Sequence, residues 1–346
     1  GLGTVADLGA KNLVVSDGLT TVKTNVTMKG LPDIYQTLIS CTETEIITSG
    51  AGILHYVPSL RNSPEIALEH IALAYFKGDY TGYIENFLVN GTIKTNLGAI
   101  NTHLNMSIPD FSSKTASYSG NVSAANVMIG DFLKQPLLGN ISLNEEFSGK
   151  SFDPDELQLK IDGTIGELGI KGYNYHNIST HGTLAKKQFN GNLLVDDPNL
   201  ALEFDGNINY AGKIPEINAK AHLLGSNFKS LNLTKDLLTL SADFDLNCRG
   251  NNIDNFTGYA LLNNIDLKSN THKLAIDSVL INANGDSLSR YVSVKSNDVT
   301  ALIKGKYQLT KIPNSIQYYL SRYIPNYIKA PGNYIPDQNF DFSVYW

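Results

Sequence analysis

The 346-residue sequence contains little cysteine, little tryptophan and few charged residues. Its two cysteines, Cys41 and Cys248, belong to no CxxC pair or Cys/His cluster, so they indicate neither a zinc site nor a disulfide framework and fit either redox compartment. The single tryptophan argues against a polysaccharide-cleaving β-enzyme, which would need Trp and acidic residues gathered in one cleft. Charged residues make up 17%, the net charge is −6 and no Lys/Arg-rich run occurs, which argues against nucleic acid as a partner.

Motifs for catalysis, cofactors and metals are also missing. There is no GxSxG, P-loop or dinucleotide-binding fingerprint, and the nearest histidine pair, His176 and His181, has no third ligand at a useful spacing. The acidic segment 243–247 invites comparison with a calcium loop, but Cys248 and Asp254 stand where an EF-hand needs Gly and Glu. We therefore predict a protein that is not an enzyme and uses no cofactor or metal.

No apolar run reaches the eighteen or so residues of a membrane-spanning helix, and no signal peptide is recognisable. The sequence opens at Gly1 without a methionine and ends in an alternating segment, 340–346, with no turn after it. We therefore interpret it as an excerpt of a longer chain and expect any membrane anchor to lie outside this excerpt.

Alternation of apolar and polar residues dominates what is present. Segment 197–212 places five large apolar residues at even positions: Leu200, Leu202, Phe204, Ile208 and Tyr210. Similar alternation runs through 83–108, with breaks near Gly91 and Gly98, and through 157–175, with turns at Gly163 and near Gly169 and Gly172; it recurs through 240–267. A Gly–polar–apolar unit recurs at irregular intervals, in which Gly serves either as a hairpin turn or as a bend within a strand. This pattern predicts an all-β chain of antiparallel strands.

Signals for helices are few. We predict short helices near 32–39 and 315–328, and segment 126–136 is a weaker candidate. In 315–328 one stripe of the helix is apolar, and Pro325 interrupts it: Ile316, Leu320, Tyr323 and Tyr327. Two interpretations stay open, a helix that covers a groove and a helix that caps the end of a sheet; the pattern favours the cap.

A sheet with one apolar face must hide that face by closing, by stacking on a second sheet or by packing under helices. Helices are too few, and composition marks no boundary, so we expect one continuous segment over 1–346. Its elongated, curled antiparallel sheet would form a taco-like hydrophobic groove. An open trough of this kind exposes more apolar surface than a soluble monomer tolerates. A lipid acyl chain would relieve this exposure by roughly 0.8 kcal/mol per CH₂ removed from water. A dry, sealed β interior is the alternative.

Several segments resemble the AsmA/TamB family. Residues 76–100, FKGDYTGYIENFLVNGTIKTNLGAI, resemble its F-x-G-x-[FY]-x-G-[FY] strand pair and T-x-L-G turn. Residues 189–210, FNGNLLVDDPNLALEFDGNINY, resemble its F-x-G-x-L-x-V-x-D-P-N-L repeat, and 212–233 and 250–267 are similar to two further elements. The resemblance covers nearly the whole chain, although neither an N-terminal anchor nor a barrel-docking domain is recognisable in it.

The resemblance implies a bridge-like, non-enzymatic conduit for phospholipids in the periplasm, between the inner and outer membranes of a bacterium. It further implies an inner-membrane anchor outside this segment and an Omp85-type outer-membrane barrel as partner. A periplasmic scaffold or assembly factor for outer-membrane proteins is the alternative. The alternation selects twelve residues as lipid-lining candidates: Leu200, Leu202, Phe204, Ile208, Tyr210, Ile217, Leu223, Phe244, Leu246, Phe256, Ile265 and Leu267.

Overall fold

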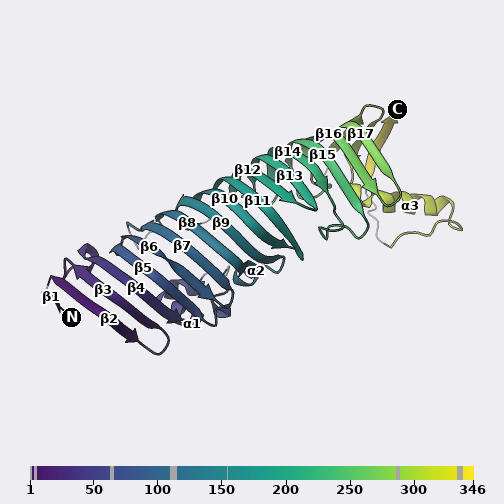
Figure 1. The fold of residues 1–346 in the computed structure, drawn as a ribbon. Helices are drawn as coiled ribbons and strands as arrows, with labels where there is room; N and C mark the ends of the chain where they lie inside the picture. Colours follow the sequence, from purple (N-terminus) through teal and green to yellow (C-terminus); the bar gives the residue numbers. More distant parts are fainter. Residues whose placement is uncertain are drawn as a thin grey trace. The chain divides into compact units, whose positions relative to one another are not determined.

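The computed structural model describes residues 2–3, 6–62, 66–109, 115–153, 155–285, 289–332 and 338–346. Strands make up 63% of the chain and helix 11%, and the strands form a curled, open antiparallel sheet (Figure 1). This confirms the predicted fold class. Alternating side chains point to opposite faces of a strand, so the sequence pattern that forms the strands also gives the sheet one apolar and one polar face.

The chain divides into two compact units, where the even composition predicts one continuous segment. Unit 1 consists of 1–187, 191–198 and 230–232, and unit 2 consists of 188–190, 199–229 and 233–346. The division falls among the strands and not at a Pro/Gly/Ser-rich linker, which explains why composition does not mark it.

Unit 1 is a meander in which each strand from β1 to β10 pairs antiparallel with the next. Its strands are β1 (Leu2–Gly3), β2 (Asp7–Ser16), β3 (Thr21–Lys29), β4 (Leu38–Thr48), β5 (Ala74–Tyr83), β6 (Asn86–Thr95), β7 (Gly98–Ser107), β8 (Ser117–Met128), β9 (Leu138–Lys150), β10 (Gln158–Ile170) and β11 (Tyr173–Ala185). Strand β12 (Gln188–Asp197) also lies mostly in this unit.

Unit 2 continues in the same manner, and each of its strands pairs antiparallel with the next. The strands are β13 (Leu200–Asn209), β14 (Glu216–Ser226), β15 (Leu238–Arg249), β16 (Thr257–Ser269), β17 (Lys273–Gly285), β18 (Arg290–Ser296), β19 (Thr300–Lys306) and β20 (Asn339–Tyr345).

Two glycines that the pattern assigns to breaks or turns lie inside strands. Gly91 is in the middle of β6 and Gly163 in the middle of β10, so a break near Gly91 and a turn at Gly163 are both wrong. Both lie beneath a large neighbouring side chain. A Cβ on Gly91 would come within 2.6 Å of the Phe76 ring, and a Cβ on Gly163 within 2.8 Å of the Glu145 carboxylate. These glycines allow close approach across the sheet.

Bulges interrupt the regular ladder of unit 1. Three residues with φ of 51–52° stand at shifts of register, and all three are polar: Asn12 in β2, Glu43 in β4 and Asn126 in β8. The main-chain N–H of each donates to a side chain on the adjoining strand at 2.9–3.0 Å: Asn25, Asp79 and Ser142, respectively. Unit 2 has a similar site at Asn264 (φ 52°) in β16, whose Nδ2 donates to Asp243. Such bulges bend a strand and increase its twist.

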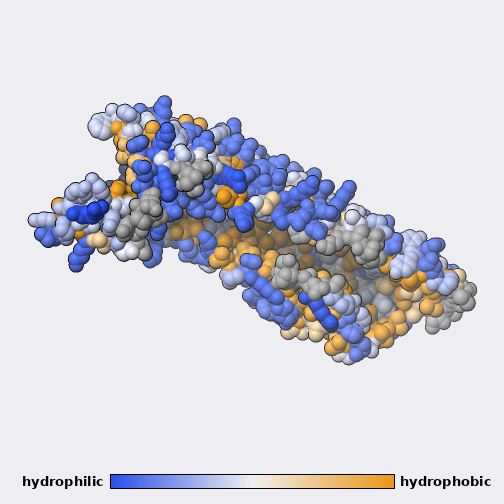
Figure 2. Space-filling view, turned by 180° about the vertical axis from the view of Figure 1, so that it is seen from behind, coloured by the Kyte–Doolittle hydropathy of each residue, from blue (hydrophilic) through white to orange (hydrophobic). Residues whose placement is uncertain are grey.

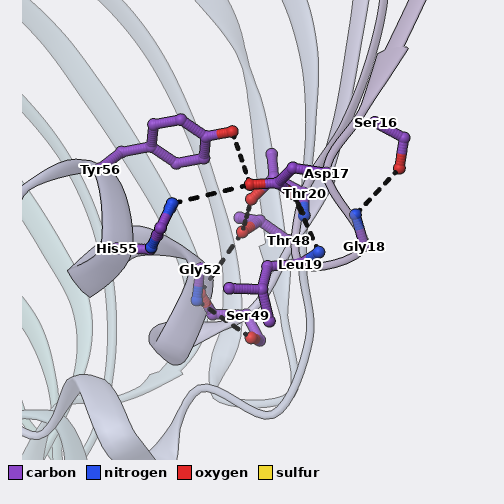
Figure 3. Close-up of polar contacts among 10 residues, drawn as sticks. All are labelled: Ser16, Asp17, Gly18, Leu19, Thr20, Thr48, Ser49, Gly52, His55 and Tyr56. Carbon is purple, nitrogen blue, oxygen red and sulfur yellow. Dashed lines mark hydrogen bonds and ion pairs between the residues drawn. The ribbon is translucent and has the colours of Figure 1, made fainter.

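Helix α1 (Gly50–Tyr56), which the sequence pattern does not predict, is fixed to the β2–β3 turn through Asp17 (Figure 3). Asp17 accepts hydrogen bonds from Thr20 N at 2.7 Å, from Tyr56 OH at 2.8 Å and from Leu19 N at 2.9 Å. These bonds, first that from Thr20, hold the pKa of Asp17 below its ordinary value. Ser49 caps the helix by accepting from Gly52 N at 3.3 Å.

Short helical segments close a small core that packs against α1 at one end of the unit 1 strands. They are η2 (Pro58–Asn62), η3 (Leu68–His70) and α2 (Ile129–Phe132), the last of which lies within the weaker candidate 126–136. The core combines Leu68, Ile71, Ala74 and Leu97.

The helix predicted near 32–39 is a single 3-10 turn, η1 (Ile34–Gln36), because β4 begins at Leu38. The one predicted near 315–328 forms as α3 (Ile312–Tyr323), preceded by η4 (Leu309–Lys311). It ends at Tyr323, two residues before Pro325, because proline has no main-chain N–H and cannot continue the helical hydrogen-bond pattern.

Candidate functional site

The apolar face of unit 1 consists of side chains that neighbour one another across β5–β11. On β5–β7 the register aligns Phe76, Ile93 and Ile100, and it aligns Tyr80, Val89 and Leu104. On β9–β11 it aligns Leu143, Ile165 and Ile178, and it pairs Phe147 with Ile161. Large apolar side chains therefore form rows that run across the strands.

The opposite face of the same strands is polar and exposed. Asp162 of β10 stands between Glu146 of β9 and His181 of β11, and His181 Nδ1 lies 2.9 Å from the Asp162 carboxylate. On β6 and β7 the corresponding positions include Asn90 and His103. The residues of the apolar face are half-buried or buried, and those of the polar face are mostly exposed.

The apolar face of unit 2 contains most of the residues predicted to line a lipid path. The register places Phe204 opposite Ala221, which pairs in turn with Phe244. It also pairs Leu202 with Leu223, and Ile208 with Ile217; Leu246 pairs with Ala219 on one side and Ala260 on the other. Glu203 and Asp205, between these positions in β13, are exposed. The structure thus brings seven of the predicted residues onto one face: Leu202, Phe204, Ile208, Ile217, Leu223, Phe244 and Leu246.

The other predicted residues lie at the margins of this face. Leu200 begins β13, beyond a register shift, and Tyr210 follows the strand and is exposed. Ile265 and Leu267 lie in β16 beyond the bulge at Asn264, and Leu267 pairs with Leu240 of β15.

Figure 2 shows hydrophobic residues gathered in a hollow of the surface, with hydrophilic residues around it.

Phe256 precedes β16 and lines a cavity of about 490 Å³ in unit 2. Other apolar side chains line the same cavity: Ile253, Ile281, Val292, Ile303 and Phe342. Arg290 is only 4% exposed and donates to the carbonyl oxygens of Ile253 at 2.7 Å and Phe256 at 3.1 Å, as well as to that of Asp254. The arginine therefore fixes the 253–256 loop as one wall of the cavity.

The apolar stripe of α3 is largely exposed. Ile316 and Leu320 lie on the helix, Tyr323 is its last residue, and Tyr327 lies beyond its end with 89% of its surface exposed. Whether this stripe covers a groove stays a prediction.

Glu145, a charged residue that the sequence analysis did not identify, stands on the apolar face of unit 1. Glu145 in β9 shares its face with Leu143 and Phe147 and is 8% exposed. Its Oε1 accepts a hydrogen bond from Thr180 Oγ1 at 2.8 Å, while Oε2 has no hydrogen-bond partner among the described residues. Burial raises the pKa of Glu145. The parity of Glu145 with Leu143 and Phe147 is the signal that would have identified it.

His176, His181 and the acidic segment 243–247, which the sequence analysis weighed as metal ligands, each pair with a different side chain. His176 Nδ1 lies 3.1 Å from Asp197, and His222 Nδ1 lies 2.8 Å from Asp243. Hydrogen bonds from His222 and then Asn264 lower the pKa of Asp243. In the part of the chain that the structure describes, no three His, Cys, Asp or Glu side chains are arranged to hold a metal ion.

No protein-family model, characterised protein or solved structure matches the chain. Among the described residues, no helix has both the length and the apolar character needed to cross a membrane. The fold and the site together define an all-β protein with a curled, open sheet that carries a large apolar face.

Proposed function

We propose that this protein is a non-enzymatic conduit for phospholipid acyl chains, which lie along the apolar face of its sheet. The observation that carries the proposal is the apolar face itself. In each unit, rows of Leu, Ile and Phe side chains continue across neighbouring strands, and most of these side chains are only half-buried. For ten methylene groups removed from water, the gain would be on the order of 8 kcal/mol.

The mechanism follows from the chemistry of the two faces. Acyl chains contact aliphatic and aromatic side chains, which offer no hydrogen bonds and therefore distinguish little beyond hydrocarbon. The head groups remain near water. Because successive rows offer similar weak contacts, a chain can exchange between them without a large barrier, and the direction of net movement is set outside this segment.

The resemblance to AsmA/TamB proteins supports the cellular setting that we propose. In that setting the chain lies in the periplasm, an anchor outside this segment holds it at the inner membrane, and phospholipid passes towards the outer membrane. An Omp85-type barrel is the proposed partner there.

Photocrosslinking on β13 tests the proposal, because neighbouring positions on one strand face opposite sides. A photoreactive residue is placed at Leu202 or Phe204, and the matched controls carry it at the exposed positions Glu203 and Asp205. We expect covalent phospholipid adducts at Leu202 and Phe204 and few at the controls. Organic-solvent extraction of the purified protein should also yield phospholipid. Equal labelling at all four positions, or an extract without lipid, would favour a scaffold with a dry interior.

A further inference from the structure

The apolar face of unit 1 is divided lengthwise between β9 and β11. Leu143, Ile165 and Ile178 form one apolar row, and Phe147 and Ile161 belong to a second. Between the two rows lies a middle row in which Gly163 stands between Glu145 and Thr180. A lipid bound on this face would therefore contact apolar side chains on both sides of a narrow polar strip.

Glu145 is built into this middle row. Its side chain reaches from β9 across β10 to Thr180 of β11, where Oε1 accepts the 2.8 Å hydrogen bond. Gly163 makes this reach possible, since a Cβ at that position would lie 2.8 Å from Glu145 Oε2. The carboxylate thus has one oxygen fixed by Thr180 and the other lying over the glycine, on the apolar face.

No nearby group that the structure describes offsets the cost of burying the second carboxylate oxygen of Glu145, Oε2. Oε2 is buried and has no hydrogen-bond partner among the described residues, a state that costs about 1–3 kcal/mol or more for a charged group. The charged groups nearest in the register, Glu146, Asp162 and His181, belong to the polar face of the same strands. Burial and the negative charge of Asp162 both raise the pKa of Glu145, while the bond from Thr180 lowers it.

We propose that Glu145 Oε2 binds the ammonium group of an amine-bearing lipid whose tails occupy the two flanking apolar rows. An ammonium supplies an N–H donor and a positive charge, which are the two things that a buried carboxylate oxygen without a partner lacks. The inference rests on the proposed function and assigns it a preferred head group.

The test compares lipids that differ only in the head group. Short-chain phosphatidylethanolamine, phosphatidylcholine and phosphatidylglycerol with identical tails compete with a fluorescent acyl probe for the purified chain. The variants are Glu145→Gln, which keeps the shape but removes the charge, and Glu146→Gln, the exposed neighbour on the opposite face. We expect wild type to prefer phosphatidylethanolamine about fivefold to tenfold, and Glu145→Gln to lose that preference, as the loss of one charge-assisted hydrogen bond predicts. Glu146→Gln should bind as wild type does.

The outcomes separate this inference from the proposed function. If no lipid displaces the probe from wild type, the proposed function fails. If all three lipids bind wild type equally, or Glu145→Gln retains the preference, lipid binding stands and the role of Glu145 is overturned. A wild-type preference for phosphatidylglycerol would assign Oε2 to a hydroxyl donor and would equally overturn the ammonium assignment.

Discussion

The guanidinium carbon of Arg290 lies 5.8 Å from the centre of the Tyr307 ring, and both side chains are buried in unit 2. The same guanidinium donates to main-chain carbonyl oxygens of the 253–256 loop. One side chain therefore joins the 253–256 loop, which helps to line the unit 2 cavity, to the sheet and to the Tyr307 ring.

Replacing Arg290 with lysine should loosen this loop. Lysine keeps the charge but cannot reach several carbonyl oxygens with a planar fork, so we expect the free energy of unfolding to fall by about 2–4 kcal/mol. Urea unfolding measures the loss, and amide exchange in 253–256 should accelerate. Arg249→Lys is the control, because Arg249 is exposed and 3.8 Å from Glu216. Unchanged exchange in the loop of Arg290→Lys would contradict this role.

Gly163→Ala should destabilise unit 1, whereas Gly166→Ala on the same strand should not. A Cβ at Gly163 would clash with Asn144 O and lie 2.8 Å from the Glu145 carboxylate, but at Gly166 its nearest neighbour is Ser142 O at 3.8 Å. We expect a loss of about 1–3 kcal/mol for the first change and little for the second. Thermal unfolding of the two variants measures the difference, and equal midpoints would disprove the close approach at Gly163.

The pH dependence of stability should change in Glu145→Gln. An acid whose pKa is raised on folding binds its proton more tightly in the folded state, so its contribution to stability falls as pH rises from the unfolded value near 4.5 through the raised folded value. Wild type should therefore lose stability across this window relative to Glu145→Gln. Urea unfolding at pH 4, 5, 6 and 7 tests this, with Glu146→Gln as control. Parallel curves for wild type and Glu145→Gln would show that Glu145 is not desolvated.

Thr180→Val should weaken unit 1 only while Glu145 is present. Valine has the shape of threonine but cannot donate to Oε1, so the single change should cost about 1–3 kcal/mol. In a double-mutant cycle with Glu145→Met, which removes the acceptor oxygen but keeps a side chain of similar length, we expect a coupling energy of about 1 kcal/mol or more. Additive effects in the cycle would mean that the 2.8 Å hydrogen bond contributes little.

The sequence predicts the sheet far better than it predicts the polar detail on it. Alternation at Leu202 and Phe204 against Glu203 and Asp205 is a local property of each strand, so the faces of β13 follow from it directly. The sequence analysis did not identify Glu145 because an acidic residue is normally assigned to the polar face. Only its position two residues before Phe147, on the same side of the strand, indicates that it lies on the apolar face.

Other features depend on the chain as a whole. Gly91 and Gly163 suit a turn as well as a strand interior, and the choice is made by Phe76 and Glu145 on neighbouring strands. Helix α1 has a short apolar stretch with no strong periodicity, and its stability depends on contacts such as that between Tyr56 and Asp17.

The bulges at Asn12, Glu43 and Asn126 have a consequence for how such a chain can evolve. Each accommodates one additional residue while a side chain next door accepts the displaced N–H. Insertion or loss of a single amino acid at these points changes the alternation of side chains between the two faces in only half of a strand. The other half keeps its side chains on the same faces. Proteins with such bulges can therefore change the length of their repeats during evolution until no constant period remains, while the apolar face of the sheet is kept.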